Sequence, residues 1–233
     1  MGDTIVLDIK FKFGQGEDVI HPVVLKDDVN MVLIDCGYTD FLPLVEQAMK
    51  GKNLACCELT HVLITHHDHD HMGALYEFKQ KYPKVQVVAS EKETPYISGE
   101  FKSLRLEQAE AMQSCLPEEQ KSFGLCFCNI LRSVRPVGVD LEVRDGDVLD
   151  WCGGCTIIGT PGHTPGHISI YVNKKKVLIT GDAAALENGE LVMANPQFTL
   201  DTKAAEESLR KIISYGAKEI ICYHGGVNQL ASY

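Results

Sequence analysis

Residues 65–73 read Thr-His-His-Asp-His-Asp-His-Met-Gly, so six consecutive positions carry four imidazoles and two carboxylates. Such groups are seldom crowded together for packing, because each one needs its own buried partner or must stay in water. The preceding residues 59–64 are mostly apolar and predict a buried strand. The polar run therefore falls on a loop at the carboxyl end of a strand, and its side chains are of the types that hold divalent metals. A solvated His-rich tract is the alternative, against which the strand and the closing Gly73 argue.

The bulk composition narrows the class of protein. The chain has 233 residues, which suits one domain, and we expect a single domain over 1–233 with a helical insertion at about 90–137. No stretch approaches the roughly 20 apolar residues of a membrane span, and the first residues lack a signal-peptide pattern, so the expected location is cytoplasmic. The net charge of −10 argues against nucleic-acid and membrane partners. The one tight basic cluster, residues 174–176, is typical of a hairpin turn.

The cysteines are expected to be reduced. There are nine of them, an odd number, in a chain without an export signal. Cys152 and Cys155 have zinc-knuckle or redox spacing, with Cys126 and Cys128 as a possible second pair, but buried free thiols are the favoured interpretation.

The order of predicted elements indicates an α+β fold. A hairpin turn is expected around residues 27–28, and the Glu-, Gln-, Lys- and Ala-rich segment 90–137 predicts the helical insertion. Hairpins, then strand–helix alternation, then hairpins suggest two mixed sheets packed together with helices outside. Strands are predicted at 4–13, 19–26, 30–34, 61–65, 85–88, 139–143, 155–159, 167–172, 177–180 and 219–223, and helices at 41–50, 74–81 and 202–215.

Three further polar residues follow apolar strands. His163 lies in a loop stiffened by glycine and proline, Asp182 follows residues 177–181, and His224 follows residues 220–223. Any one of them could be a capping aspartate or a histidine satisfied in the core. Three such residues, each at a strand end, favour ligands over packing.

Taken together, these motifs resemble those of the metallo-β-lactamase-fold hydrolase superfamily. Its usual first motif is Thr-His-x-His-x-Asp-His-x-Gly, followed by a single His, a single Asp and a final His. The resemblance implies an αββα four-layer sandwich with two metals at the sheet edges. It also implies that Asp35, at a strand end, braces the metal loop from behind.

The chain departs from that motif at one ligand position, where Asp68 replaces the usual His. The implied first metal site is His66, Asp68 and His163. The implied second site is Asp70, His71 and His224, with Asp182 bridging the two. The extra carboxylate lowers the net positive charge of the pair, and oxygen donors suit iron or manganese better than an all-imidazole site does. We expect two divalent ions, with zinc preferred and iron or manganese open. His67 and His69 are then outer or substrate-facing residues, or exposed loop histidines.

The predicted function is hydrolysis of a small ester, thioester or lactone by a hydroxide that bridges two metals. Asp70 or Asp182 could carry the proton onward. The substrate is expected to be a small acyl compound. Lactonases of the superfamily usually carry a Tyr three residues after the bridging Asp, where this chain has Ala185. Hydroxyacylglutathione hydrolases use a His at the position of Asp68 and a basic C-terminal extension, and neither is found before Tyr233.

Two alternatives stay open at this point. One is an iron-dependent oxygenase acting on a sulfur substrate, and the other is a non-catalytic sensor module with structural metals. The insertion is expected to form a lid or a homodimer surface, and its Tyr96, Phe101, Phe123 and Phe127 either line a substrate pocket or pack in a core.

Overall fold

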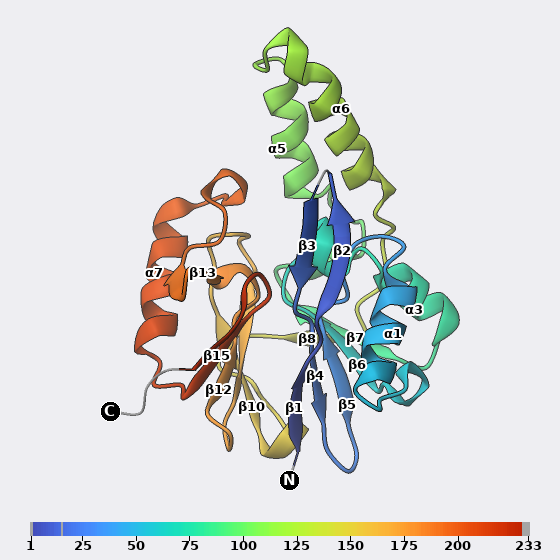
Figure 1. The fold of residues 1–233 in the computed structure, drawn as a ribbon, viewed down its shortest axis with the longest axis vertical. Helices are drawn as coiled ribbons and strands as arrows, with labels where there is room; N and C mark the ends of the chain where they lie inside the picture. The colour runs from blue at the N-terminus through green and yellow to red at the C-terminus, as the bar shows by residue number, and fades with distance from the viewer. Residues whose placement is uncertain (1, 15, 230–233) are drawn as a thin grey trace.

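The computed structural model describes residues 2–14 and 16–229, which build two six-stranded sheets in the middle of the molecule (Figure 1). The first sheet has the order β1-β4-β5-β6-β7-β8, with strands Asp3–Val6, Val23–Lys26, Met31–Ile34, His61–Ile64, Gln86–Ser90 and Leu141–Val143. The second has the order β16-β15-β12-β11-β10-β9, with strands Gly226–Gln229, Glu219–Cys222, Val177–Ile179, Ile168–Val172, Cys155–Gly159 and Val148–Leu149.

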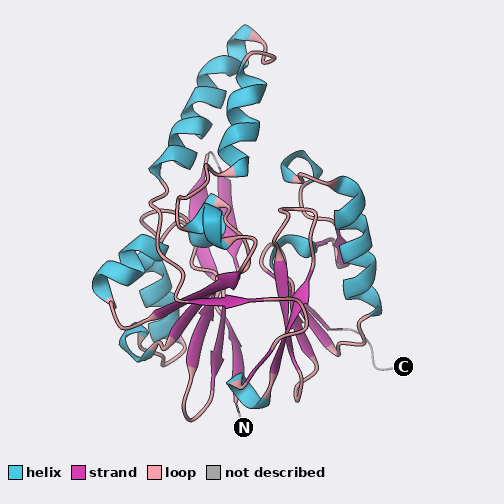
Figure 2. Cartoon of the chain, turned by 180° about the vertical axis from the view of Figure 1, so that it is seen from behind, coloured by secondary structure: helices cyan, strands magenta, loops and turns pink. Residues whose placement is uncertain are grey.

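Helices cover the outer faces of both sheets. Helices α1 (Leu42–Gly51) and α3 (Leu75–Lys81) lie beside the first sheet, and α7 (Thr202–Ser214) lies beside the second (labelled in Figure 1 and seen from behind in Figure 2). This arrangement confirms the predicted αββα sandwich. Two small hairpins, β2–β3 and β13–β14, stand apart from the main sheets, with strands Ile9–Phe13, Gly16–Ile20, Ala185–Glu187 and Glu190–Val192. Helix α2 (His69–Met72) follows β6, and short 3₁₀ turns lie at Cys56–Glu58, Trp151–Gly153, Gly181–Ala183 and Pro196–Phe198.

The central strands are apolar on both faces because both faces are buried. Successive side chains of a strand point to opposite faces of its sheet. In β5 and β6, Leu33 and Val62 pack toward the helices, while Val32 and Leu63 pack against the second sheet. Such strands therefore appear in the sequence as continuous hydrophobic runs.

Two of the expected strands are wrong as single elements. The run 4–13 divides into β1 and β2, and the run 19–26 divides into β3 and β4. The breaks face each other, since the Leu7 N–H donates to the carbonyl of Pro22 at 2.9 Å. Proline has no N–H to donate to a ladder, and β4 begins directly after it, at Val23. The expected hairpin turns at 27–28 and 174–176 are confirmed, because β4–β5 and β11–β12 are antiparallel neighbours.

The helical segment predicted between residues 90 and 137 contains three helices: α4 (Thr94–Ile97), α5 (Leu104–Gln113) and α6 (Glu118–Ser133). Helices α5 and α6 pack against each other and rise from the body as a hairpin (top of Figure 1). All nine cysteines are free. Cys128, Cys152 and Cys155 are buried as expected, whereas Cys126 is exposed, so the expectation of a buried thiol is wrong there. Across the described ranges, no helix is both long and apolar enough to cross a bilayer.

Candidate metal centre

The seven residues expected to hold metals meet at one edge of the sandwich. His66 and Asp68 lie in the loop after β6, and Asp70 and His71 lie in the single-turn helix α2 (His69–Met72). The other three, His163, Asp182 and His224, follow β10, β12 and β15. They fall into three overlapping groups whose possible ligand atoms lie within 4.8 Å of one another: His66, Asp68 and His163; His66, His71 and Asp182; and Asp70, His71 and His224.

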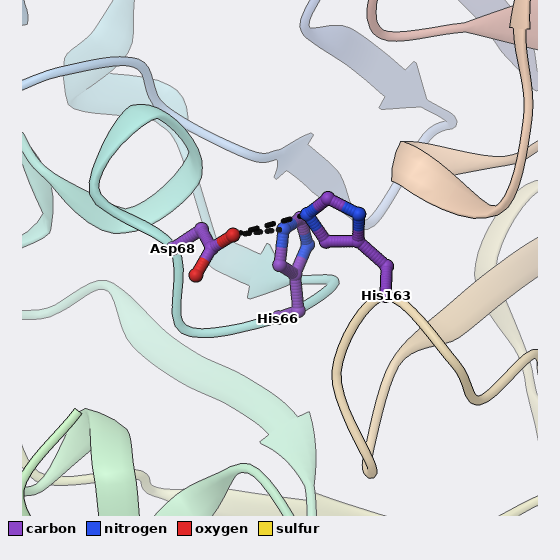
Figure 3. Close-up of side chains that lie close together, drawn as sticks. All are labelled: His66, Asp68 and His163. Carbon is purple, nitrogen blue, oxygen red and sulfur yellow. Dashed lines mark hydrogen bonds and ion pairs between the residues drawn. The ribbon is translucent and has the colours of Figure 1, made fainter. Parts of the chain in front are cut away.

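The first group is drawn in Figure 3. The Asp68 Oδ2 atom lies 3.0 Å from His163 Nε2 and 3.6 Å from His66 Nε2. All three side chains are buried. Because the two nitrogens point at the same carboxylate oxygen, this group is arranged to surround one small cation.

The second group lies closer to solvent. The Asp70 Oδ2 atom is 3.3 Å from His224 Nε2 and 3.7 Å from His71 Nε2. The His224 side chain keeps 31% of its surface exposed, whereas His71 is fully buried. A cation held here would therefore face the outside on the side of His224.

Asp182 lies between the two groups with one oxygen directed to each. Its Oδ1 atom is 3.2 Å from His71 Nε2 and 3.7 Å from His224 Nε2, and its Oδ2 atom is 3.5 Å from His163 Nε2. A carboxylate placed in this way offers one oxygen to each of the two groups.

Unpaired polar atoms support the fit to metals. Within residues 2–14 and 16–229, the buried atoms His66 Nε2, His71 Nε2 and Asp182 Oδ1 accept or donate no hydrogen bond. Leaving a buried polar atom unpaired is unfavourable, and a buried unpaired charge more so. Divalent cations would satisfy all three atoms, so the residues present fit such a group.

The charged side chains of the site shift one another's pKa values. Burial alone would lower the pKa of His71, but the carboxylates of Asp182, Asp35 and Asp70 raise it well above its usual value. Burial likewise opposes ionisation of Asp182, yet His71 and His224 hold the pKa of this carboxyl well below its ordinary range. The carboxylates are therefore ionised at neutral pH, as metal ligands must be.

Asp35 braces the metal loop, as the resemblance implied. It follows β5 with a positive φ of 58° and is buried. One carboxylate oxygen accepts the Thr65 N–H at 2.8 Å, and the other accepts the Thr65 hydroxyl and His71 Nδ1–H, both at 2.8 Å. Fixing Nδ1 in this way directs His71 Nε2 into the site.

The close of the loop depends on Gly73. A Cβ atom there would lie 2.3 Å from the Thr39 backbone nitrogen and 2.4 Å from the His69 carbonyl oxygen. Any larger residue would push α2, and the ligands on it, out of place.

Three buried residues around the centre were missed by the sequence analysis. His167 is the first, and its Nε2 accepts the Asp182 backbone N–H at 3.0 Å while its Nδ1 bonds to the Thr160 hydroxyl at 2.8 Å. Burial keeps the pKa of His167 well below its usual value, so it is neutral and acts as an acceptor. It therefore fixes the short turn that carries Asp182.

Glu93 is the second missed residue, and it joins two ligand-bearing loops. It is fully buried and accepts the His67 N–H at 2.9 Å and the Thr164 hydroxyl and Gly166 N–H at 2.8 Å each. It also contacts His67 Nδ1. His67 is thus a buried structural residue, not an exposed loop histidine.

The third missed residue, Arg105, comes from α5 in the helical segment. Its Nη2 lies 2.6 Å and its Nε 3.1 Å from Asp68 Oδ2. No motif in the sequence indicates that Glu93 or Arg105 lies at this site, because each is separated from its partners there by a long stretch of chain. Asp68 itself was the one available signal, since a carboxylate in place of a neutral imidazole requires extra positive charge.

A cleft of about 310 Å³ opens onto both ligand groups and is lined in part by Tyr38, His69, Phe127 and Phe198. His69 is therefore positioned to face a substrate. Of the four aromatic residues proposed for a pocket, Phe127 alone lines this cleft. Tyr96 and Phe101 border a neighbouring hollow, and Phe123 is 78% exposed on α6, so its assignment to a pocket or a core is wrong.

Comparison with known proteins places this architecture in a family. The family model described as Metallo-beta-lactamase superfamily matches residues 16–224. The probable metallo-hydrolase YflN of Bacillus subtilis is 27% identical over 207 residues, which cover 84% of this chain and 75% of YflN. The hydroxyacylglutathione hydrolase GloC of Haemophilus influenzae is 28% identical over 160 residues, covering 69% of this chain and 64% of GloC.

Among solved structures, a metallo-beta-lactamase family protein from Thermus thermophilus, TTHA1429, superposes with a TM-score of 0.74 at 22% identity. The match covers 97% of this chain and 74% of that protein, and it shows the shared fold. Because the family model spans most of the chain, the protein belongs to the metallo-beta-lactamase superfamily, as a metal-dependent hydrolase.

Proposed function

We propose that the protein is a dinuclear metal-dependent hydrolase that acts on a small ester, thioester or lactone. The observation that carries this proposal is Asp182, whose two oxygens face separate ligand groups at 3.2 Å and 3.5 Å from His71 and His163. A structural site would need neither a shared carboxylate nor an open cleft beside it. The first ion would be held by His66, Asp68 and His163, and the second by Asp70, His71 and His224.

When bound there, two divalent ions would acidify a shared water toward neutral pH and polarise a substrate carbonyl. Zinc is the preferred ion, and iron or manganese suits the oxygen-rich ligand set almost as well.

The protein's own side chains would bind and orient the substrate. The aromatic rings of Phe127 and Phe198 lie with centroids 5.8 Å apart at the wall of the cleft, and they offer an apolar surface to an acyl group. Asp70 is the carboxylate that solvent reaches best, with 14% of its side chain exposed, so it is placed to pass a proton outward. The name of GloC, a hydroxyacylglutathione hydrolase, supports an acyl-transfer substrate without identifying it.

A substrate panel tests this proposal. Wild-type protein, Asp182→Ala and the exposed control Asp28→Ala would be assayed on simple esters, thioesters, lactones and phosphodiesters, with metal content measured in parallel. We expect turnover of a carboxylic acyl substrate that falls at least about 100-fold in Asp182→Ala and is unchanged in the control. A metal-loaded wild type as silent as Asp182→Ala over the whole panel would refute the proposal and favour a sensor module.

A further inference from the structure

Arg105 lies at the metal centre rather than beside it. It is 2% exposed and occupies the first turn of α5, where the Ser103 hydroxyl caps the helix. Besides its two contacts with Asp68 Oδ2, its Nη2 lies 3.3 Å from His163 Nε2. Its Nη1 is fixed by the Gln108 side chain at 2.6 Å.

These contacts use the lone pairs that a metal at the first group would need. His163 Nε2 and Asp68 Oδ2 lie 3.0 Å apart in this group, and each faces the same guanidinium nitrogen. A residue that only supported Asp68 from behind would contact the carboxylate oxygen turned away from the other ligands. The opposite holds here, because Asp68 Oδ1 is the buried oxygen without a hydrogen bond.

The second group has no comparable competitor. In the described part of the chain, the recorded ion-pair partners of Asp70 and Asp182 are histidines, namely His69, His71, His163 and His224. A histidine that loses its proton becomes a ligand itself, whereas an arginine keeps its charge and cannot bind a metal. A metal entering between Asp70, His71 and His224 therefore displaces no permanently charged side chain.

We propose that Arg105 competes with a metal ion for the site of His66, Asp68 and His163, and that it makes the metal affinities of the two sites unequal. The site of Asp70, His71 and His224 fills first. The site of His66, Asp68 and His163 fills only when Arg105 releases His163, and this release lowers the measured affinity. Because Arg105 lies on α5 of the helical hairpin, metal binding at the site of His66, Asp68 and His163 depends on the position of α5. This inference rests on the metal centre of the proposed function and adds a difference between its two sites.

A zinc titration against a chromophoric chelator tests the inference with the purified full chain. Wild type is expected to show two binding events of different affinity. His163→Ala should remove the weaker event, and His224→Ala the tighter one. Arg105→Met should tighten the weaker event about 10- to 100-fold, which is the free energy of one charge-assisted hydrogen bond expressed as a binding ratio. The tighter event should not change.

Arg132→Met is the matched control, because this arginine lies on α6 in the same hairpin and pairs with Glu110 at the surface. It should leave both events unchanged. Equal affinities in wild type, loss of the tighter event in His163→Ala, or a weaker event that stays the same or weakens further in Arg105→Met would each overturn the inference. Should Arg105→Met not fold, Arg105→Gln removes the same charge, and the wild-type titration still decides whether the sites are unequal. The titration reads affinity and not turnover, so its result is independent of whether the protein hydrolyses the panel.

Discussion

Replacing Asp35 by Asn tests how the fold holds its metal loop. The substitution keeps the size and shape of the side chain, and asparagine tolerates the positive φ of 58° at this position. What changes is the chemistry, because one of the two acceptor oxygens becomes an NH₂ group. Asp35 accepts three hydrogen bonds from buried groups, so no orientation of the amide can satisfy all three donors.

The size of the effect follows from those contacts. At least one buried donor loses its acceptor, which costs about 1–3 kcal/mol, and the remaining bonds lose the benefit of the negative charge, about 1 kcal/mol each. We expect metal-free Asp35→Asn to be less stable by about 3 kcal/mol. For a chain of this length, that corresponds to a melting temperature lower by roughly 6–12 °C. His71 also loses the partner that orients its ring, so metal affinity should fall about 10- to 100-fold.

Thermal unfolding of metal-free protein measures the change in stability, and a chelator competition assay measures the change in metal affinity. Asp28→Asn is the control, since Asp28 is exposed. The reasoning is refuted if Asp35→Asn melts with the control and binds zinc with the same affinity.

Three further predictions concern the turn between β4 and β5, the contacts of Glu93 and the cleft beside the candidate metal centre. Asp27 accepts backbone N–H groups of Val29, Asn30 and Cys152 at 2.7–2.8 Å, and although burial alone would raise its pKa, these bonds lower it. The ionised Asp27 therefore stabilises the fold fully above its unfolded pKa of about 3.9, and this stabilisation is lost as the pH falls through the lower folded pKa. Asp27→Asn should lower the free energy of unfolding by about 1 kcal/mol at pH 7. Chemical denaturation should show that the variant loses less stability than wild type does below about pH 4. Glu93→Gln should lower the free energy of unfolding by about 2 kcal/mol and weaken metal binding at the site that contains His163. Equal weakening at both sites in a zinc titration would contradict the role of Glu93 in joining the loops that carry His67 and Thr164. Phe127→Ala should raise KM about 3- to 10-fold with little change in kcat, while Phe123→Ala, its exposed neighbour on α6, should behave as wild type in the same steady-state assay.

The convergence of the candidate ligands could be predicted from the sequence because each follows an apolar strand. A run such as Val177–Ile179 shows where a buried strand ends, and a polar residue directly after it must lie at the sheet edge. Asp182 and His224 follow such strands and lie 3.7 Å apart, and Asp35 follows β5 and contacts the same site through His71.

Arg105 and Glu93 could not be predicted in the same way. Their partners lie 37 and 26 residues away, at Asp68 and His67, and nothing in a helical segment shows which charged residue turns inward. The hairpin β13–β14 was missed although it had a signal. Asn188 and Gly189 both have positive φ, as a tight two-residue hairpin turn requires. The assignment of residues 1–233 to a single domain, and of the insertion to a dimer surface, stays a prediction.

Anomalous diffraction from crystals grown with excess zinc tests most directly whether the protein binds two metals that share Asp182. We predict two peaks in each molecule, one among His66, Asp68 and His163 and the other among Asp70, His71 and His224, with the Asp182 carboxylate in contact with both ions. A single peak under saturating zinc, or two ions of which Asp182 touches only one, would contradict the claim.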